Sequence, residues 1–121
     1  MADDTGDITL DELRQRVRRF VVERGWDRYH SPKNLAMALS VEASELLEVF
    51  QWLTEEESRN LAAPAKAAAA DEVADVLIYL LQLCHQLGIE PLAAARDKIA
   101  KNALKYPVES SRGNNKKYTE L

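Results

Sequence analysis

The chain has 121 residues, enough for one domain with a single hydrophobic core and too few for two. With 46% hydrophobic and 30% charged residues the composition excludes a disordered or membrane-embedded chain, and a net charge of −4 disfavours a general nucleic-acid-binding surface. Ala and Leu together number 33 against 16 for Val, Ile and Thr, which favours helix over strand. A lone cysteine, Cys84, and an acidic N-terminus without signal-peptide features predict a soluble protein of the cytoplasm.

Capping and breaking residues divide the chain into helices. Thr9, Ser31 and Thr54 are N-cap residues that precede apolar residues at helical spacing, while Gly25 and Gly88 stop helices. The expected elements, in chain order, are a flexible segment 1–8, a helix from Thr9 to about Gly25, a loop 26–30, a helix 32–53, a short helix or turn 55–61, a break at 62–64, a helix 65–87, a helix from Pro91 to just before Tyr106, and a polar, extended segment 107–121, flexible from 108 onward.

Four helices with short connections predict an all-α fold, an antiparallel four-helix bundle formed by a single domain over residues 1–121. The third long helix is unusual for a small monomer, because it is apolar nearly all the way round from Val73 to Leu87. Such a helix is normally buried on every side. We therefore expect a second bundle to pack against it, in a homo-oligomer.

Carboxylates interrupt the apolar stripes of two helices. In the second helix Glu42 falls in the middle of the stripe and Glu45 at its edge, and in the third helix Glu72 and Asp75 repeat the pattern. Four inward carboxylates repel one another, and the basic residues are concentrated elsewhere in the chain. A divalent cation would neutralise them, and an all-oxygen ligand set suits Mg²⁺ or Mn²⁺.

Other readings of this pattern are weaker. A single E-x-x-E pair is usually a solvated helix face, but two pairs that both interrupt an apolar stripe are not typical of one. Di-iron bundles take Glu-x-x-His from two helices. Here His30 lies in a loop, and Gln82 stands three residues before His85. A zinc site lacks ligands for the same reason.

Further residues fit a substrate that carries phosphates and a flat ring. Lys98, Asn102 and Lys105 share one face of the fourth helix, although such a face is often merely solvated, and the tail adds Arg112, Lys116 and Lys117. Aromatic residues cluster near the acidic helices, and Trp52 shares the side of Glu45. A base stacked on tryptophan with its triphosphate on metal is a sensible arrangement. The aromatic cluster consists of Trp26, Tyr29, His30, Trp52 and Tyr79, although aromatic residues in a helical bundle are usually part of its core.

These motifs resemble the MazG-like all-α nucleoside triphosphate pyrophosphatases. That family carries Glu-x-x-Glu, a spacer and Glu-x-x-Asp, which here are Glu42-Ala-Ser-Glu45, 26 residues and Glu72-Val-Ala-Asp75. Within the family the chain is most similar to the dCTP pyrophosphatase branch. The stretches that carry the likeness are WDRYHSPKNL (26–35), VEASELLEVFQW (41–52), DEVADVLIY (71–79), KIAKNALKYP (98–107) and SRGNNKKYTEL (111–121).

The resemblance implies Mg²⁺-dependent hydrolysis of a nucleoside triphosphate to the monophosphate and pyrophosphate, by a homo-dimer or homo-tetramer. It implies that Glu42, Glu45, Glu72 and Asp75 hold the metal. Of these motif carboxylates, Glu45 or Glu42 is our candidate for the group that orients or deprotonates the attacking water. The resemblance also assigns a substrate pocket to Trp26, His30, Trp52, Tyr79 and Asn102, with Lys98 and Lys105 on the phosphates. Many members have a further Glu immediately before the first motif residue, where this chain has Val41. The dCTP branch also tends to lack this Glu, so Val41 does not indicate a loss of activity.

Two alternatives stay open at this point. The first keeps the reaction and changes the base, to dUTP, a modified nucleotide or a broad set. The second is a helical bundle that binds nucleotides or partners without turnover. The four inward carboxylates disfavour the second alternative, because they cost stability unless a cation is bound. A nucleic-acid binder that uses the basic tail is disfavoured by the net charge.

Overall fold

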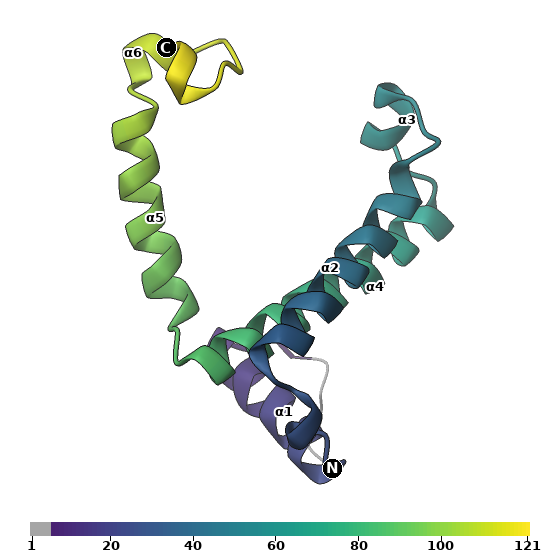
Figure 1. Cartoon of the computed structure of the whole chain (residues 1–121). Helices are drawn as coiled ribbons and strands as arrows, with labels where there is room; N and C mark the ends of the chain where they lie inside the picture. Colours follow the sequence, from purple (N-terminus) through teal and green to yellow (C-terminus); the bar gives the residue numbers. More distant parts are fainter. Residues whose placement is uncertain (1–5) are drawn as a thin grey trace. The chain divides into compact units, whose positions relative to one another are not determined.

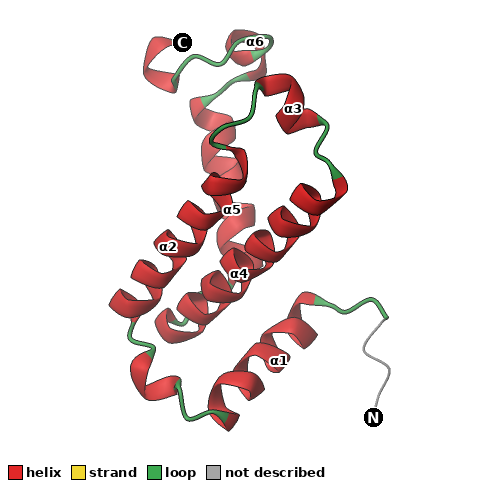
Figure 2. Cartoon of the chain, turned by 90° about the vertical axis from the view of Figure 1, so that its right-hand side faces the viewer, coloured by secondary structure: helices red, strands yellow, loops and turns green. Residues whose placement is uncertain are grey.

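The computed structural model describes residues 6–121, and all regular structure in that range is helical (Figure 2), as the sequence predicts. The chain forms two compact units, which meet in sequence at Gly88 and Ile89 and are each described separately. The first unit contains α1 (Leu10–Glu23), η1 (Asp27–Tyr29), α2 (Pro32–Phe50), α3 (Glu55–Arg59) and α4 (Ala63–Leu87), and the second contains α5 (Pro91–Lys105), α6 (Val108–Ser111) and η2 (Tyr118–Glu120). The expected flexible segment 1–8 lies mostly outside the described residues.

The helices begin at the predicted caps. Thr9 Oγ1 accepts a hydrogen bond from the backbone N–H of Glu12, and Ser31 Oγ accepts one from Asn34. Thr54 and Glu57 form a reciprocal capping box at the start of α3. At the end of α4, Gly88 takes the left-handed conformation (φ +67°) that closes a helix at low cost for glycine.

The first unit is organised around α2 and α4, which lie side by side and antiparallel (Figure 1). Their contact is the most extensive between any two elements, and α1 packs on α4 as well. Leu35 of α2 is almost fully buried, as are Val21 of α1 and Leu81 of α4. This core holds two facing helices at a fixed register, so residues near their middles are brought opposite one another.

Two predicted helix boundaries are wrong by a few residues. The second helix ends at Phe50 rather than at residue 53, with Gln51 as its C-cap. The third begins at Ala63, so Pro64 lies in its first turn instead of marking a break before residue 65. Proline is compatible with a first turn, because the backbone N–H groups there have no helical acceptor.

The second unit contains α5, which spans Pro91–Lys105 as predicted. The expectation of an extended segment over 107–121 is wrong, because it contains the helical turns α6 and η2. The tail returns to α5 through Tyr118, whose ring meets Tyr106 edge-on at 6.1 Å between centroids and lies 4.8 Å from Lys105 Nζ. The residues in these contacts are 12 or more positions apart in the sequence, so the local pattern of polar residues gives no sign of them. The segment therefore reads as extended from its sequence alone.

The third long helix of the prediction, now α4, is not buried on every side within one chain. Val73 is 53% exposed, and Leu77, Leu80 and Leu87 are exposed as well. No helix in residues 6–121 is long and apolar enough to cross a membrane.

Candidate functional site

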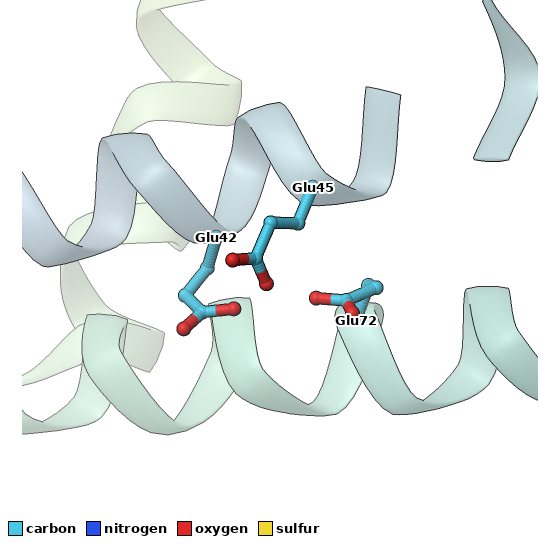
Figure 3. Close-up of side chains that lie close together, drawn as sticks. All are labelled: Glu42, Glu45 and Glu72. Atoms are coloured by element: carbon cyan, nitrogen blue, oxygen red, sulfur yellow. The ribbon is translucent and has the colours of Figure 1, made fainter. Parts of the chain in front are cut away.

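Three of the predicted carboxylates meet between α2 and α4. Glu42 and Glu45 project from α2 toward Glu72 of α4 (Figure 3), and one oxygen from each lies within 4.8 Å of the others. The juxtaposition follows from the fold, because the antiparallel contact places the middle of α2 opposite the first half of α4. The arrangement gives a cluster of oxygen ligands on two rigid helices.

Burial and neighbouring charges raise the pKa of two glutamates in this cluster. Burial raises the pKa of Glu42 to about 7, helped by its hydrogen bond with Glu45 and by the charges of Glu45, Asp75 and Glu72. The pKa of Glu72 is also raised, first by burial and then by the charge of Glu45. Glu42 and Glu72 therefore resist ionisation while no cation lies between the two helices.

The donor set fits a hard divalent cation. Oε2 of Glu42 and Oε2 of Glu72 are buried, and within the described residues neither accepts a hydrogen bond. A buried carboxylate oxygen without a partner is costly, and a bound cation would satisfy both atoms at once. Because all the donors are carboxylate oxygens, the site suits Mg²⁺ or Mn²⁺ better than a metal that prefers nitrogen or sulfur.

The fourth predicted ligand, Asp75, lies one turn further along α4 and is not part of the tight group. Its charge contributes to the raised pKa of Glu42, so it is close to the cluster. Asp75 also lines a cavity of about 360 Å³. The acidic cluster and the cavity therefore share this residue.

The cavity lies between α1, α4 and the segment that joins α1 to α2, and its volume is in the range of small-molecule sites. Most of its wall is aliphatic or aromatic. Its lining residues are Leu13, Arg16, Val17, Phe20, Val21, Trp26, His30, Asp75, Ile78, Tyr79 and Gln82.

The structure brings three of the predicted pocket residues together in this cavity, namely Trp26, His30 and Tyr79. The Trp26 ring meets Phe20 edge-on at 5.7 Å between ring centroids. Nδ1 of His30 is buried and has no hydrogen-bond partner within residues 6–121. Trp52 does not line the cavity. It follows α2 and is 86% exposed in the single chain.

An anchor that the sequence did not reveal holds the segment with Trp26 and His30. Asp27 accepts hydrogen bonds from Arg18 of α1 at 2.9 and 3.3 Å and from Gln86 of α4 at 3.1 Å. The Arg18 guanidinium keeps the pKa of Asp27 below its ordinary value. The three residues tie η1 to both helices that flank the cavity.

The other three predicted substrate residues belong to the second unit. Lys98, Asn102 and Lys105 lie on α5 at the spacing of one helix face. Lys105 Nζ lies over the Tyr118 ring, so the tail is in contact with this face. Their role at the phosphates stays a prediction.

The chain is similar to known proteins over most of its length. A family model described as the MazG-like family matches residues 37–121. The chain is 41% identical to dCTP pyrophosphatase 1 of Mus musculus and 37% identical to that of Homo sapiens, in each case over 93% of this chain and 68% of the relative. A crystal structure of a pyrophosphatase from Archaeoglobus fulgidus is 42% identical with a TM-score of 0.78, over 88% of this chain and 99% of that one.

Proposed function

The chain belongs to the MazG-like family, and from this membership and the geometry of its acidic site we propose that it is a Mg²⁺-dependent nucleoside triphosphate pyrophosphohydrolase. The preferred substrate is dCTP or a related modified pyrimidine deoxynucleotide, and the products are the monophosphate and pyrophosphate. The relatives named dCTP pyrophosphatase 1 support this choice of base. The role we propose is removal of unwanted deoxynucleotides from the cytoplasmic pool.

One observation carries the proposal, which is that the acidic cluster adjoins a cavity of nucleoside size. Asp75 contributes to both, with carboxylates on one side and Trp26 and Tyr79 on the other. A nucleoside triphosphate has the same polarity, with a flat ring at one end and a chain of phosphates at the other. Bound in this direction, the base lies in the cavity and the α-phosphate reaches the carboxylates.

The residues divide the chemical work by position. Glu42, Glu45, Glu72 and Asp75 would hold the cation, which neutralises phosphate charge and lowers the pKa of water when bound. Water attacks the α-phosphorus, the α–β anhydride bond breaks, and pyrophosphate leaves. We assign orientation of that water, and acceptance of its proton, to Glu45, the most exposed of the three clustered glutamates, with Glu42 as the alternative.

Product analysis tests the reaction. Purified protein with Mg²⁺ is given each common and 5-modified (d)NTP, and the monophosphate, diphosphate, pyrophosphate and phosphate are separated. Monophosphate plus pyrophosphate, strongest with dCTP or its 5-modified forms, supports the whole proposal. The same products spread over other bases keep the reaction and replace the substrate by the dUTP-type or broad-specificity alternative.

A pair of variants links the activity to the site. Glu42→Gln is expected to abolish turnover, whereas the matched change Glu56→Gln in the exposed helix α3 leaves it intact. Folded wild-type protein that turns over no nucleotide would replace the enzyme proposal by the non-catalytic nucleotide-binding bundle.

We also propose that the chain acts as a homo-dimer or homo-tetramer. The exposed apolar residues of α4, such as Val73 and Leu77, support this assembly, because contiguous apolar surface of this kind usually lies in an interface. Light scattering coupled to size exclusion measures the mass directly. A mass of one chain at micromolar concentration would contradict the proposal.

A further inference from the structure

Gln82 is a buried polar residue for which the proposed reaction has no use so far. It lies on α4 between Leu81 and Leu83 and is only 6% exposed. Its Oε1 is buried and accepts no hydrogen bond from the described residues. A buried amide oxygen without a donor lowers the stability of the folded chain, and leucine at this position would avoid that cost. The cost is understandable if a ligand supplies the missing donor.

The position of Gln82 shows where that ligand would lie. Gln82 lines the cavity together with Asp75, Ile78 and Tyr79. Counted from Asp75, these residues stand at i, i+3, i+4 and i+7 and so form one stripe of α4. Seven residues separate Asp75 from Gln82, or about 10 Å along the helix axis. This is the reach of a nucleotide from its α-phosphate to the far edge of its base.

The chemistry of a primary amide restricts the group that it can meet. Its oxygen accepts and its NH₂ donates, side by side in one plane. The matching base edge has an exocyclic amino group next to an unprotonated ring nitrogen. Cytosine has this edge, and adenine shares it on a larger ring. Uracil has the reverse pattern, a carbonyl at position 4 beside N3–H, and pairs with the amide only after the amide turns by 180°, so that Oε1 accepts from N3–H.

On this basis we propose that Gln82 is a specificity-determining residue that reads the amino-bearing edge of the base, which is cytosine in the preferred substrate. The inference rests on the proposed function and assigns recognition of the base edge to the side-chain amide of Gln82. Oε1 accepts from the 4-amino group while the Nε2 amide donates to ring N3. Trp26 and Tyr79 supply the flat walls of the same cavity, so they bind a ring without distinguishing its edge.

The test removes the contact from each side in turn. The substrates are dCTP, dUTP, dATP and the 4-deamino analogue of dCTP, a pyrimidin-2-one that keeps ring N3 and lacks only the amino group. The proteins are wild type, Gln82→Met, which keeps the shape without donor or acceptor, and the matched control Gln15→Met on an exposed position of α1. The readout is kcat/KM for each pair with Mg²⁺, and thermal melting checks that each protein is folded.

For wild type and Gln15→Met we expect kcat/KM to fall about 10- to 100-fold from dCTP to the deamino analogue, the size of one buried hydrogen-bond pair. In Gln82→Met, kcat/KM falls further for dCTP, which loses both hydrogen bonds, than for the analogue, which loses only the one to ring N3. The ratio of dCTP to analogue therefore falls toward one. dATP has the same hydrogen-bonding edge as dCTP on a larger ring, so its kcat/KM tests whether the size of the cavity excludes adenine. A preference of wild type for dATP over dCTP would overturn the choice of cytosine.

Failure of this inference differs from failure of the proposed function. If wild type hydrolyses dCTP and the deamino analogue equally well, Gln82 does not read the amino group, while the reaction itself stands. This arm uses wild-type protein alone and is therefore independent of whether Gln82→Met folds. An unchanged ratio of dCTP to analogue in folded Gln82→Met refutes the inference as well. No hydrolysis of any nucleotide by wild type refutes the proposed function and the inference with it.

Discussion

Replacing Glu42 by Gln should stabilise the chain without metal and remove its response to Mg²⁺. Glu42 titrates near pH 7 in the folded chain against an ordinary value of 4.5, because burial and the neighbouring carboxylates disfavour its charge. The unfolded chain therefore loses this proton first as the pH rises. The free energy of unfolding falls between about pH 4.5 and 7 and keeps its lower value above pH 7.

The size of the effect is set by how much solvent the carboxylate retains. The full difference in pKa would correspond to about 3 kcal/mol. Because the Glu42 side chain is only partly buried and the cluster is screened by water, we expect about 1–2 kcal/mol. For a chain of this length that is a rise of about 3–8 °C in the melting temperature of Glu42→Gln at pH 8 in EDTA. At pH 4.5 the two proteins should melt at similar temperatures.

Magnesium should reverse the order of stability. At a concentration 100-fold above its dissociation constant, a cation that binds only the folded chain adds about 2.7 kcal/mol to wild type. Glu42→Gln keeps the hydrogen bond toward Glu45 but offers a weaker ligand, so its gain is smaller. The assay is thermal unfolding at fixed protein concentration, at both pH values, with EDTA or Mg²⁺. Glu56→Gln should follow wild type throughout.

Two results would refute this reasoning. A lower melting temperature for Glu42→Gln than for wild type at pH 8 in EDTA would mean that the ionised Glu42 does not destabilise the folded chain. An equal gain from Mg²⁺ in both proteins would mean that the cation binds elsewhere. Either result would remove the physical basis for assigning the metal to these glutamates.

Three further changes test other parts of the molecule. Asp27→Asn breaks the ion pair with Arg18, so the segment with Trp26 is no longer held in place. We therefore expect a higher KM for dCTP with kcat nearly unchanged. An unchanged KM would contradict this role of Asp27. Trp52→Ala should raise KM without lowering the melting temperature, since the ring is exposed in the single chain; normal steady-state kinetics would exclude Trp52 from the substrate site. Gly88→Ala should lower the free energy of unfolding in urea by about 1–2 kcal/mol, because Gly88 has a left-handed backbone. Within residues 6–121 the added methyl group would meet no atom within 4 Å apart from its chain neighbours, so the backbone is the only source of this cost. An unchanged free energy of unfolding would show that the helix end rearranges.

Local signals in the sequence were sufficient for most of the secondary structure. Caps and stop residues are short-range, so the starts of α1, α2, α3 and α5 and the end of α4 could be placed from neighbouring residues alone. The tail could not, because η2 depends on contacts of Tyr118 with Tyr106 and Lys105. These are tertiary contacts that no helical period announces.

The candidate site divides in the same way. Carboxylates that interrupt two apolar stripes predicted that Glu42, Glu45 and Glu72 would share one place, since the stripes of neighbouring helices face each other. The anchor at Asp27 was invisible, because its partner Gln86 lies 59 residues further along the chain. Gln82 did carry a signal, as a polar residue seven positions after Asp75, but its meaning depends on a cavity that exists only once α1 packs on α4.

In the proposed complex, the same element, α4, holds both ends of the substrate. Glu72, Asp75, Tyr79 and Gln82 follow one another on α4 at steps of three, four and three residues, which keeps them on one side of a rigid helix. The separation of the base from the reacting phosphorus is therefore fixed by the helix rise and not by a loop. A base that fails to reach Gln82 binds in a displaced position, and its α-phosphate is displaced from the carboxylates by a similar distance. Because small displacements of reacting groups reduce rates steeply, a wrong base should be rejected in the chemical step as well as in binding.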